Sequence, residues 1–251
     1  MQVKLVPHAV ALLILSLSGC GPSVGATADG SGATDAAASE PGYVRAAVPD
    51  RPLPPLPADA PGEWRLAFLD VETTGLVPGH HELVDVGVVL TDLDGNILDS
   101  LLVRVQPDHP ERTSPQAASI NGFTPEKWRA HGALSPEQAI DSLVAFHRRV
   151  AGESPTLMVA HNSQFDAAFL DHLFRNGQRS WREIYHYYVL DIPSMAWMLG
   201  LRELDGRRLA QRLGVEELPD GPDLHTGLRC AIGNVRMYRA LLAEAERQRD
   251  R

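Results

Sequence analysis

The stretch FLDVETTGL, residues 68–76, constrains the fold of this chain more than any other. It ends an apolar strand with two carboxylates, Asp70 and Glu72, whose spacing of two puts them on the same face of that strand. Two neighbouring anions repel each other unless a cation lies between them, and a divalent metal ion takes oxygen ligands. The pattern therefore predicts a metal site at a strand end, where open α/β sheets build their sites. Two solvated surface acids are the alternative.

Residues 1–20 differ in composition from the rest of the chain. Lys4 gives a positive start, and the apolar run AVALLILSL at 9–17 is too short to span a bilayer. The run ends in LSGC, and the whole segment resembles a bacterial lipoprotein signal peptide. That resemblance implies lipidation of Cys20, a membrane as partner and, because Gly21 follows, anchoring in the outer membrane. The alternative is a misassigned start codon and a cytoplasmic protein.

Residues 21–62 are rich in Gly, Ala, Ser, Asp and Pro and contain few large apolar side chains. Such a segment cannot bury enough surface to offset the entropy of ordering, so we expect a disordered tether with a reach of roughly 35 Å. The remaining boundaries follow from the patterning described below: a domain over 63–246 and a short tail over 247–251. Cys230 is the only cysteine besides Cys20, so a lipidated chain has no internal disulfide.

The formal net charge of −9 restricts the class of partner. A chain this acidic does not predict the strongly basic face that clamps duplex nucleic acid. Nucleic-acid substrates are still compatible with it, because a metal site supplies positive charge of its own.

The periodicity of the domain predicts strands, then helices, then alternating strands and helices. Apolar runs of strand type lie at 65–70, 83–91, 97–106, 156–161 and 189–192, with Asp94-Gly95 as the turn of a hairpin. Helices are expected after Ser114, Thr124 and Ser135, each followed by proline, and then at 164–174, 192–197, 207–213 and from about His225 into the 240s. This order predicts a mixed α/β sheet with helices on its faces.

Two further positions can join the acids of the first motif. In HNSQFDAAFL, residues 161–170, a strand ends, Asn162 or Ser163 can cap a helix, and Asp166 lies in the first helical turn. The helix dipole favours an acid there, so a structural role is the alternative. His225 lies at the start of the last helix, where a lone histidine is more often a packed or surface residue than a catalytic one.

Taken together, these motifs resemble the DEDD superfamily of 3′-to-5′ exonucleases, in the subgroup whose general base is a histidine. That family includes polymerase proofreading subunits, oligoribonuclease and RNase T, and the resemblance covers nearly all of residues 64–243. Its weaker segments are SPQAASINGFTPE at 114–126, where Asn121 stands in place of a frequent histidine, LDIPSMAW at 190–197, RRLAQRLGV at 207–215 and HTGLRCA at 225–231. The resemblance implies a ribonuclease-H-like fold, a five-stranded mixed sheet with helices on both faces.

The resemblance also implies a mechanism. Two divalent ions, Mg²⁺ or Mn²⁺, would be held by Asp70, Glu72 and Asp166, and His225 would deprotonate the attacking water. Nucleoside monophosphates would then leave the 3′ ends of single-stranded DNA or RNA. The residues expected to meet the terminal nucleotide are Thr73, Thr74, Gly75 and Leu76, the last as a wedge against the base. Several members of the family are dimers, which leaves a homodimer open.

Cys230 departs from the family pattern. The family carries a fourth metal-binding acid five residues after the histidine, and here no acid occurs from Thr226 through Ala243. One hypothesis is an exonuclease that is weak or biased toward Mn²⁺, with the thiol or a water in the ligand position. The other is a catalytically inactive domain that binds nucleic acid. A structural lipoprotein of the envelope is a third, unrelated class.

Overall fold

A single mixed sheet organises the part of the chain that the computed structural model describes, residues 55–216 and 225–251. The predicted signal peptide with Cys20, and the tether as far as residue 54, lie outside the described residues. The strands are β1 (Arg65–Thr73), β2 (Leu83–Thr91), β3 (Ile97–Arg104), β4 (Thr156–Ala160) and β5 (Val189–Asp191). Their order is β3-β2-β1-β4-β5, so β1 is central, antiparallel to β2 and parallel to β4. The predicted five-stranded mixed sheet is confirmed.

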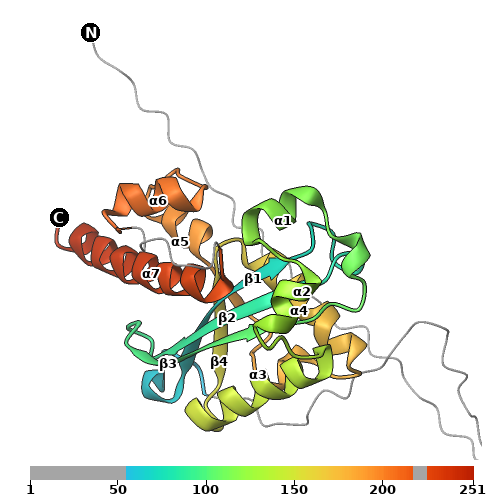
Figure 1. Ribbon diagram of the computed structural model, residues 1–251. Coiled ribbons are helices and arrows are strands. Elements are labelled where there is room, and N and C mark those ends of the chain that lie inside the picture. The colour runs from blue at the N-terminus through green and yellow to red at the C-terminus, as the bar shows by residue number, and fades with distance from the viewer. Residues whose placement is uncertain (1–54, 217–224) are drawn as a thin grey trace, which may run out of the picture. The chain divides into compact units, whose positions relative to one another are not determined.

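Helices cover both faces of the sheet (Figure 1). They are α1 (Pro115–Asn121), α2 (Pro125–Ala130), α3 (Pro136–Val150), α4 (Ser163–Asn176), α5 (Ile192–Met198), α6 (Gly206–Leu213) and α7 (Gly227–Arg249). Helices α3 and α4 pack on one face, and α5, α6 and α7 pack on the other. Among the described residues, no helix is long and apolar enough to cross a membrane.

The alternation of side chains along β1 divides the core in two. Ala67 and Leu69 are buried among side chains of α3 and α4, while Leu66 and Phe68 are buried among those of α5, α6 and α7. Because side chains alternate with a period of two, the acids that continue the second series, at positions 70 and 72, face α7. The first strand thus delivers both predicted ligands to the face on which the last helix lies.

Local side-chain hydrogen bonds begin most helices as predicted. The hydroxyls of Ser114, Thr124 and Ser135 each accept a backbone N–H of the first turn, and Ser135 forms its predicted capping box with Gln138. The last helix begins at Gly227, after the cap Thr226, and so later than predicted. The histidine before it is therefore on non-helical backbone, which frees its direction from the helix.

The cap predicted for α4 was wrong. Asn162 is the N-cap residue, but its side chain makes no capping bond, and its φ of 68° places it in the left-handed region. Instead the carboxylate of Asp191, at the end of β5, accepts the backbone N–H groups of Asn162 and Ser163, both at 3.1 Å. A carboxylate from a neighbouring strand satisfies these donors, which local sequence could not reveal.

Candidate active site

The acids of the first and second motifs meet at the carboxyl end of β1. Asp70 and Glu72 extend from the strand, and Asp166 comes from the first turn of α4 on the opposite face. Oδ1 of Asp166 accepts the backbone N–H of Val71 at 3.1 Å, which fixes the carboxylate against the strand between the other two acids. Three residues chosen by sequence pattern therefore form one cluster.

Burial and mutual repulsion dominate the electrostatics of this cluster. Burial raises the pKa of Asp70 well above its ordinary value, and the charges of Asp166 and Glu72 raise it further. The pKa of Asp166 is raised as well, again first by burial. A cation stabilises carboxylates that are buried close to one another. The oxygen atoms of three carboxylates match the ligand preference of Mg²⁺ and Mn²⁺. The residues present thus fit the divalent ions expected from the sequence.

A fourth carboxylate, Asp85 of β2, was not singled out in the sequence. It pairs with Glu72 across the two strands and is 0% exposed. One of its oxygens accepts the backbone N–H of Gly227 at 2.9 Å, at the start of α7. Burial raises the pKa of Asp85 to about 7, with the charge of Glu72 adding to the rise. The single acid inside an otherwise apolar strand, LVDVGVVL, was the signal for this residue.

Two glycines allow the first turn of α7 to touch the sheet. A Cβ on Gly87 of β2 would lie 1.9 Å from the backbone nitrogen of Leu228, and a Cβ on Gly227 would lie 2.3 Å from the carbonyl oxygen of Asp70. Any residue with a Cβ would clash with backbone atoms at either position, so both must be glycine. The close approach, together with the Asp85 cap, fixes where the residues around the start of α7 lie relative to β1.

His225 reaches the acids from this helix start. Its Nδ1 lies 2.9 Å from Oε1 of Glu72, where the ring N–H donates to the carboxylate, and this hydrogen bond raises the pKa of His225. With the proton on Nδ1, the lone pair of Nε2 is available to accept another. The side chain is 51% exposed, so water can reach it. The predicted general base is thus at the predicted metal site.

Cys230 lies in the first turn of α7, beside the histidine. Its Sγ lies 3.4 Å from Nδ1 of His225 and 3.9 Å from Nε2, and the thiol also hydrogen-bonds Asp70. Burial and the surrounding carboxylates raise the pKa of the thiol. A cysteine–histidine–acid triad needs the thiol and the acid on different ring nitrogens, whereas here Nδ1 is the nitrogen nearest to both. The arrangement is that of a ligand position rather than of a nucleophile.

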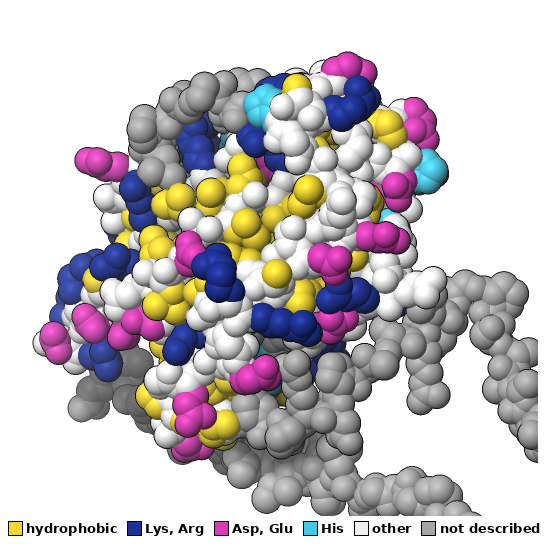
Figure 2. Space-filling view, turned by 60° about the horizontal axis from the view of Figure 1, so that its bottom comes forward, with side chains coloured by type: hydrophobic (Ala, Val, Ile, Leu, Met, Phe, Trp, Pro, Cys, Tyr) yellow, Lys and Arg dark blue, Asp and Glu magenta, His cyan; other side chains and the backbone are white. Residues whose placement is uncertain are grey.

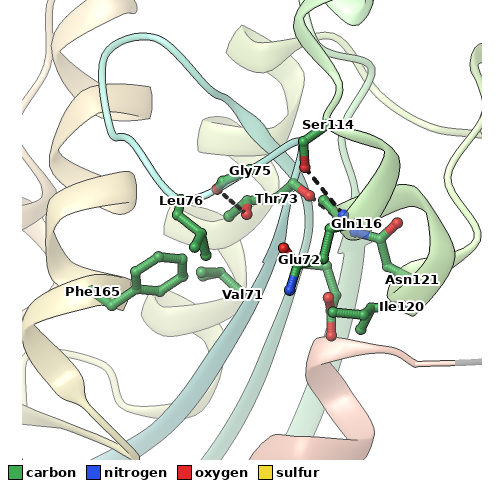
Figure 3. A pocket seen from close by; sticks show the side chains of 11 residues that line it. Val71, Glu72, Thr73, Gly75, Leu76, Ser114, Gln116, Ile120, Asn121 and Phe165 are labelled. Atoms are coloured by element: carbon green, nitrogen blue, oxygen red, sulfur yellow. Dashed lines mark hydrogen bonds between the residues drawn. The ribbon is translucent and has the colours of Figure 1, made fainter.

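The turn after β1 borders a cavity of about 160 Å³ (Figure 3). Thr73, Gly75 and Leu76 line it, and the Leu76 side chain is 74% exposed. Thr74 does not line it, because its side chain is buried and its Oγ1 accepts the backbone N–H of Glu82 at 2.9 Å. The structure therefore brings three of the four expected nucleotide-contacting residues to one opening and gives the fourth a role in the turn.

The other walls of this cavity were not predicted. Phe165 of α4 points toward Leu76 and Val71, and Ile120 of α1 lies near Glu72 (Figure 3). Asn121 donates its Nδ2–H to the carbonyl oxygen of Thr73 at 3.0 Å, which joins α1 to the end of β1. An opening with apolar walls next to the acids is of a kind that accepts a flat, apolar ring face.

A second cavity, of about 380 Å³, is bordered by Asp70. His225 and Cys230 line it together with Arg207 of α6 and Arg229 of α7. The acid cluster thus borders both cavities, the apolar one through Glu72 and the one lined by arginines through Asp70. On the face shown in Figure 2, basic and acidic side chains are interspersed, so no broad basic surface extends over it.

Comparison with known proteins identifies the family. A family model described as exonuclease, of the RNase T type, matches residues 67–229. The chain belongs to this exonuclease family. The matched range contains all four acids and His225, and it ends one residue before Cys230.

The relatives of this exonuclease domain share its pattern at low identity. It is 27% identical to oligoribonuclease of Corynebacterium diphtheriae over 187 residues, which cover 70% of this chain and 80% of that protein. It is 31% identical to the PolC-type DNA polymerase III of Thermotoga petrophila over 102 residues, 41% of this chain but 7% of the polymerase. E. coli exonuclease I in complex with a dT13 oligonucleotide superposes with a TM-score of 0.60 at 17% identity, covering 74% of this chain and 42% of exonuclease I. The last likeness shows the ribonuclease-H-like exonuclease fold.

Proposed function

We propose that this domain is a metal-dependent 3′-to-5′ exonuclease that releases nucleoside monophosphates from single-stranded ends. The observation that carries the proposal is the 2.9 Å contact between His225 Nδ1 and Glu72 Oε1. It places a base, from a residue 153 positions away in the sequence, against a cluster of carboxylates suited to divalent ions. The histidine subgroup of the superfamily has this combination of groups.

Asp70, Glu72 and Asp166 would hold the ions. When bound, divalent ions there would supply positive charge for both the attacking and the leaving oxygen of a phosphodiester. Nε2 of His225 accepts the proton of the attacking water, while Glu72 holds the ring through Nδ1. That pairing keeps the ring in the tautomer that a base requires.

The two cavities give the substrate a direction. The terminal base enters the apolar opening between Leu76, Phe165 and Ile120, and the strand leaves through the cavity that Asp70 lines together with Arg207 and Arg229. Stacking against apolar walls tolerates any base, so the site selects a free single-stranded end rather than a sequence. The oligonucleotide bound to E. coli exonuclease I is consistent with such a substrate.

Cys230 limits the rate in this proposal. A thiol is a poor ligand for Mg²⁺, so we expect low activity with Mg²⁺ and higher activity with Mn²⁺. The same residue favours the second candidate, a domain that binds 3′ ends without cleaving them. Calorimetric titration with Mn²⁺ separates the two, because only the nuclease requires occupancy by two ions.

The decisive experiment uses single-stranded DNA and RNA labelled at the 5′ end, with Mg²⁺ or Mn²⁺. Progressive shortening of the label-bearing strand, lost in Asp70→Asn, supports the proposal and gives its polarity. If no metal-dependent shortening occurs with either nucleic acid, the proposal fails. Size-exclusion chromatography with light scattering on the same preparation tests whether the protein is a homodimer.

We also propose that Cys20 carries lipid and tethers the domain to the outer membrane. The support is the sequence alone: a charged start, a short apolar run and LSGC at the expected spacing. Cell fractionation of the wild type and of Cys20→Ser tests it. A wild-type protein found only in the cytosol would contradict lipidation and favour the alternative start codon.

A further inference from the structure

Glu72, His225 and Cys230 bring three kinds of metal ligand to one point on the rim of the acid cluster. A carboxylate oxygen, a ring nitrogen and the thiol sulfur all lie within 4.8 Å of one another. The residues come from the end of β1, from the segment before α7 and from the first turn of α7. The start of α7, which carries Cys230, is held against the sheet by its glycines and by Asp85, and His225 is held by its contact with Glu72.

We propose that these three side chains form a binding site for a single zinc ion, distinct in chemistry from the all-oxygen site for Mg²⁺ or Mn²⁺. The proposal shares Glu72 with the proposed two-ion centre, but it does not require that centre to be active.

Two ligand–ligand distances can be compared with those of tetrahedral zinc. Zinc–sulfur and zinc–nitrogen bonds of about 2.3 and 2.0 Å place the two ligand atoms about 3.5 Å apart at a tetrahedral angle. Sγ of Cys230 and Nδ1 of His225 are 3.4 Å apart. Oε1 of Glu72 is 2.9 Å from the same nitrogen, a hydrogen-bond distance that needs to open by about half an ångström when a metal replaces the proton. Water fills the fourth position.

The ligand types determine which ion is selected. Thiolate and imidazole bind Zn²⁺ far better than Mg²⁺, which prefers oxygen and keeps its waters. The replacement of the expected aspartate by Cys230 therefore changes the ion that this corner of the site prefers, rather than only removing a ligand. The adjacent carboxylates of Asp70 and Asp85 add negative charge that attracts any dication.

Zinc at this site has a consequence for catalysis, which rests on the proposed function. A neutral imidazole that binds zinc through Nδ1 carries its proton on Nε2 and cannot accept another. His225 is then unable to act as the base. Zinc occupancy and nucleotide release exclude each other, and the zinc concentration sets the active fraction.

The test uses cobalt as a spectroscopic substitute for zinc in the full chain carrying Cys20→Ser, so that Cys230 is the only thiol. We expect a near-ultraviolet thiolate-to-cobalt band that saturates at one equivalent and is removed by Zn²⁺. Cys230→Ser should abolish the band, and His225→Ala should weaken zinc binding at least tenfold. His131→Ala, which alters an exposed histidine after α2, is the matched control and should leave the band unchanged.

Two results would overturn the site: no charge-transfer band at saturating cobalt, or a band that persists in Cys230→Ser. Thermal melting of each variant verifies that it is folded, and Cys230→Ala serves where the serine variant is not. A nuclease assay on the same samples keeps the two proposals separate. A one-equivalent band without any nuclease activity supports the zinc site and contradicts the exonuclease.

Discussion

Helices α4 and α7 approach the end of β1 from opposite faces, and each presents the fourth residue of its first turn to Asp70. On α4 that residue is Asp166, buried and bonded to the strand backbone. On α7 it is Cys230, a half-buried thiol beside His225. The same position in the first turn therefore carries a carboxylate on one helix and a thiol on the other. The backbones of the two helices place these side chains alike, whereas the chemistry of the side chains differs.

The largest effect is expected on the α4 side. Asp166→Asn keeps the acceptor for the Val71 N–H but removes a charge that divalent ions need, so nucleotide release should fall on the order of a thousandfold. The same change should raise the melting temperature of the metal-free protein at neutral pH, because the folded-state pKa of Asp166 is raised and its ionised form is costly. The matched control is Asp171→Asn, which only breaks the surface pair with Arg175. Unchanged activity in Asp166→Asn would show that the Asp166 carboxylate is not needed for the reaction.

The positions of His225 and Cys230 depend on the close contact between the start of α7 and the sheet. Gly87→Ala forces a Cβ into the backbone of Leu228 and should cost about 3 kcal/mol of unfolding free energy, with loss of the His225–Glu72 contact. Gly233→Ala, within the same helix, meets nothing within 4 Å and should instead stabilise by up to about 1 kcal/mol. Urea denaturation of both variants measures the difference. Equal stabilities would mean that the close approach is not maintained in solution.

His147 of α3 lies in the core on the same face of the sheet as α4, and its effect on stability changes with pH in the opposite direction from that of the acid cluster. Burial lowers the pKa of His147 to about 4, below its unfolded value of about 6.5, so the unfolded chain binds more protons between these values. Stability from this group is therefore lost as the pH falls from 6.5 to 4, by about 3 kcal/mol in total. Asp85, whose pKa is raised, contributes stability that is lost as the pH rises toward 7.

Unfolding free energies of the wild type and of His147→Gln, measured at several pH values without metal, isolate the first contribution. The glutamine variant will be less stable overall because the ring is lost, but its stability should decline less between pH 6.5 and 4. Parallel curves for the two proteins would show that His147 is not held neutral in the fold.

The smallest effect is expected from placing a carboxylate on α7 at position 230, so that it corresponds to Asp166 on α4. Cys230→Asp should raise Mg²⁺-dependent nucleotide release about tenfold and reduce the preference for Mn²⁺, because an oxygen ligand replaces sulfur. Cys230→Ser, which removes the thiol without adding a charge, is the control and should not gain activity. If the aspartate variant gains nothing with Mg²⁺, this position does not limit the reaction.

Sequence patterns predicted the sheet and singled out most of the side chains that the fold brings together, because both depend on local regularities. Period-two alternation placed Asp70 and Glu72 on one face, and proline after serine or threonine marked three helix starts. The roles of Asp85 and Asp191 depend instead on which strands are neighbours and in which register. Neither role can be recognised from the few residues that surround Asp85 or Asp191 in the sequence.

The apolar cavity illustrates the same limit. Phe165 lies in the second motif beside Asp166, but its contact with Leu76 depends on the packing of α4 over the end of β1. Ile120 comes from a third segment altogether. A wall built from three distant segments becomes visible only once the chain is folded.

The contact between Glu72 and His225 joins two residues separated by nearly the whole domain. A chain that still lacks residues 225–251 has the acids without His225, and proteolytic cleavage before His225 would return the protein to that state. Under the proposed function, an unfinished chain would therefore hold the metal-binding acids without the group that activates water, and the site would be complete only when the whole domain has folded.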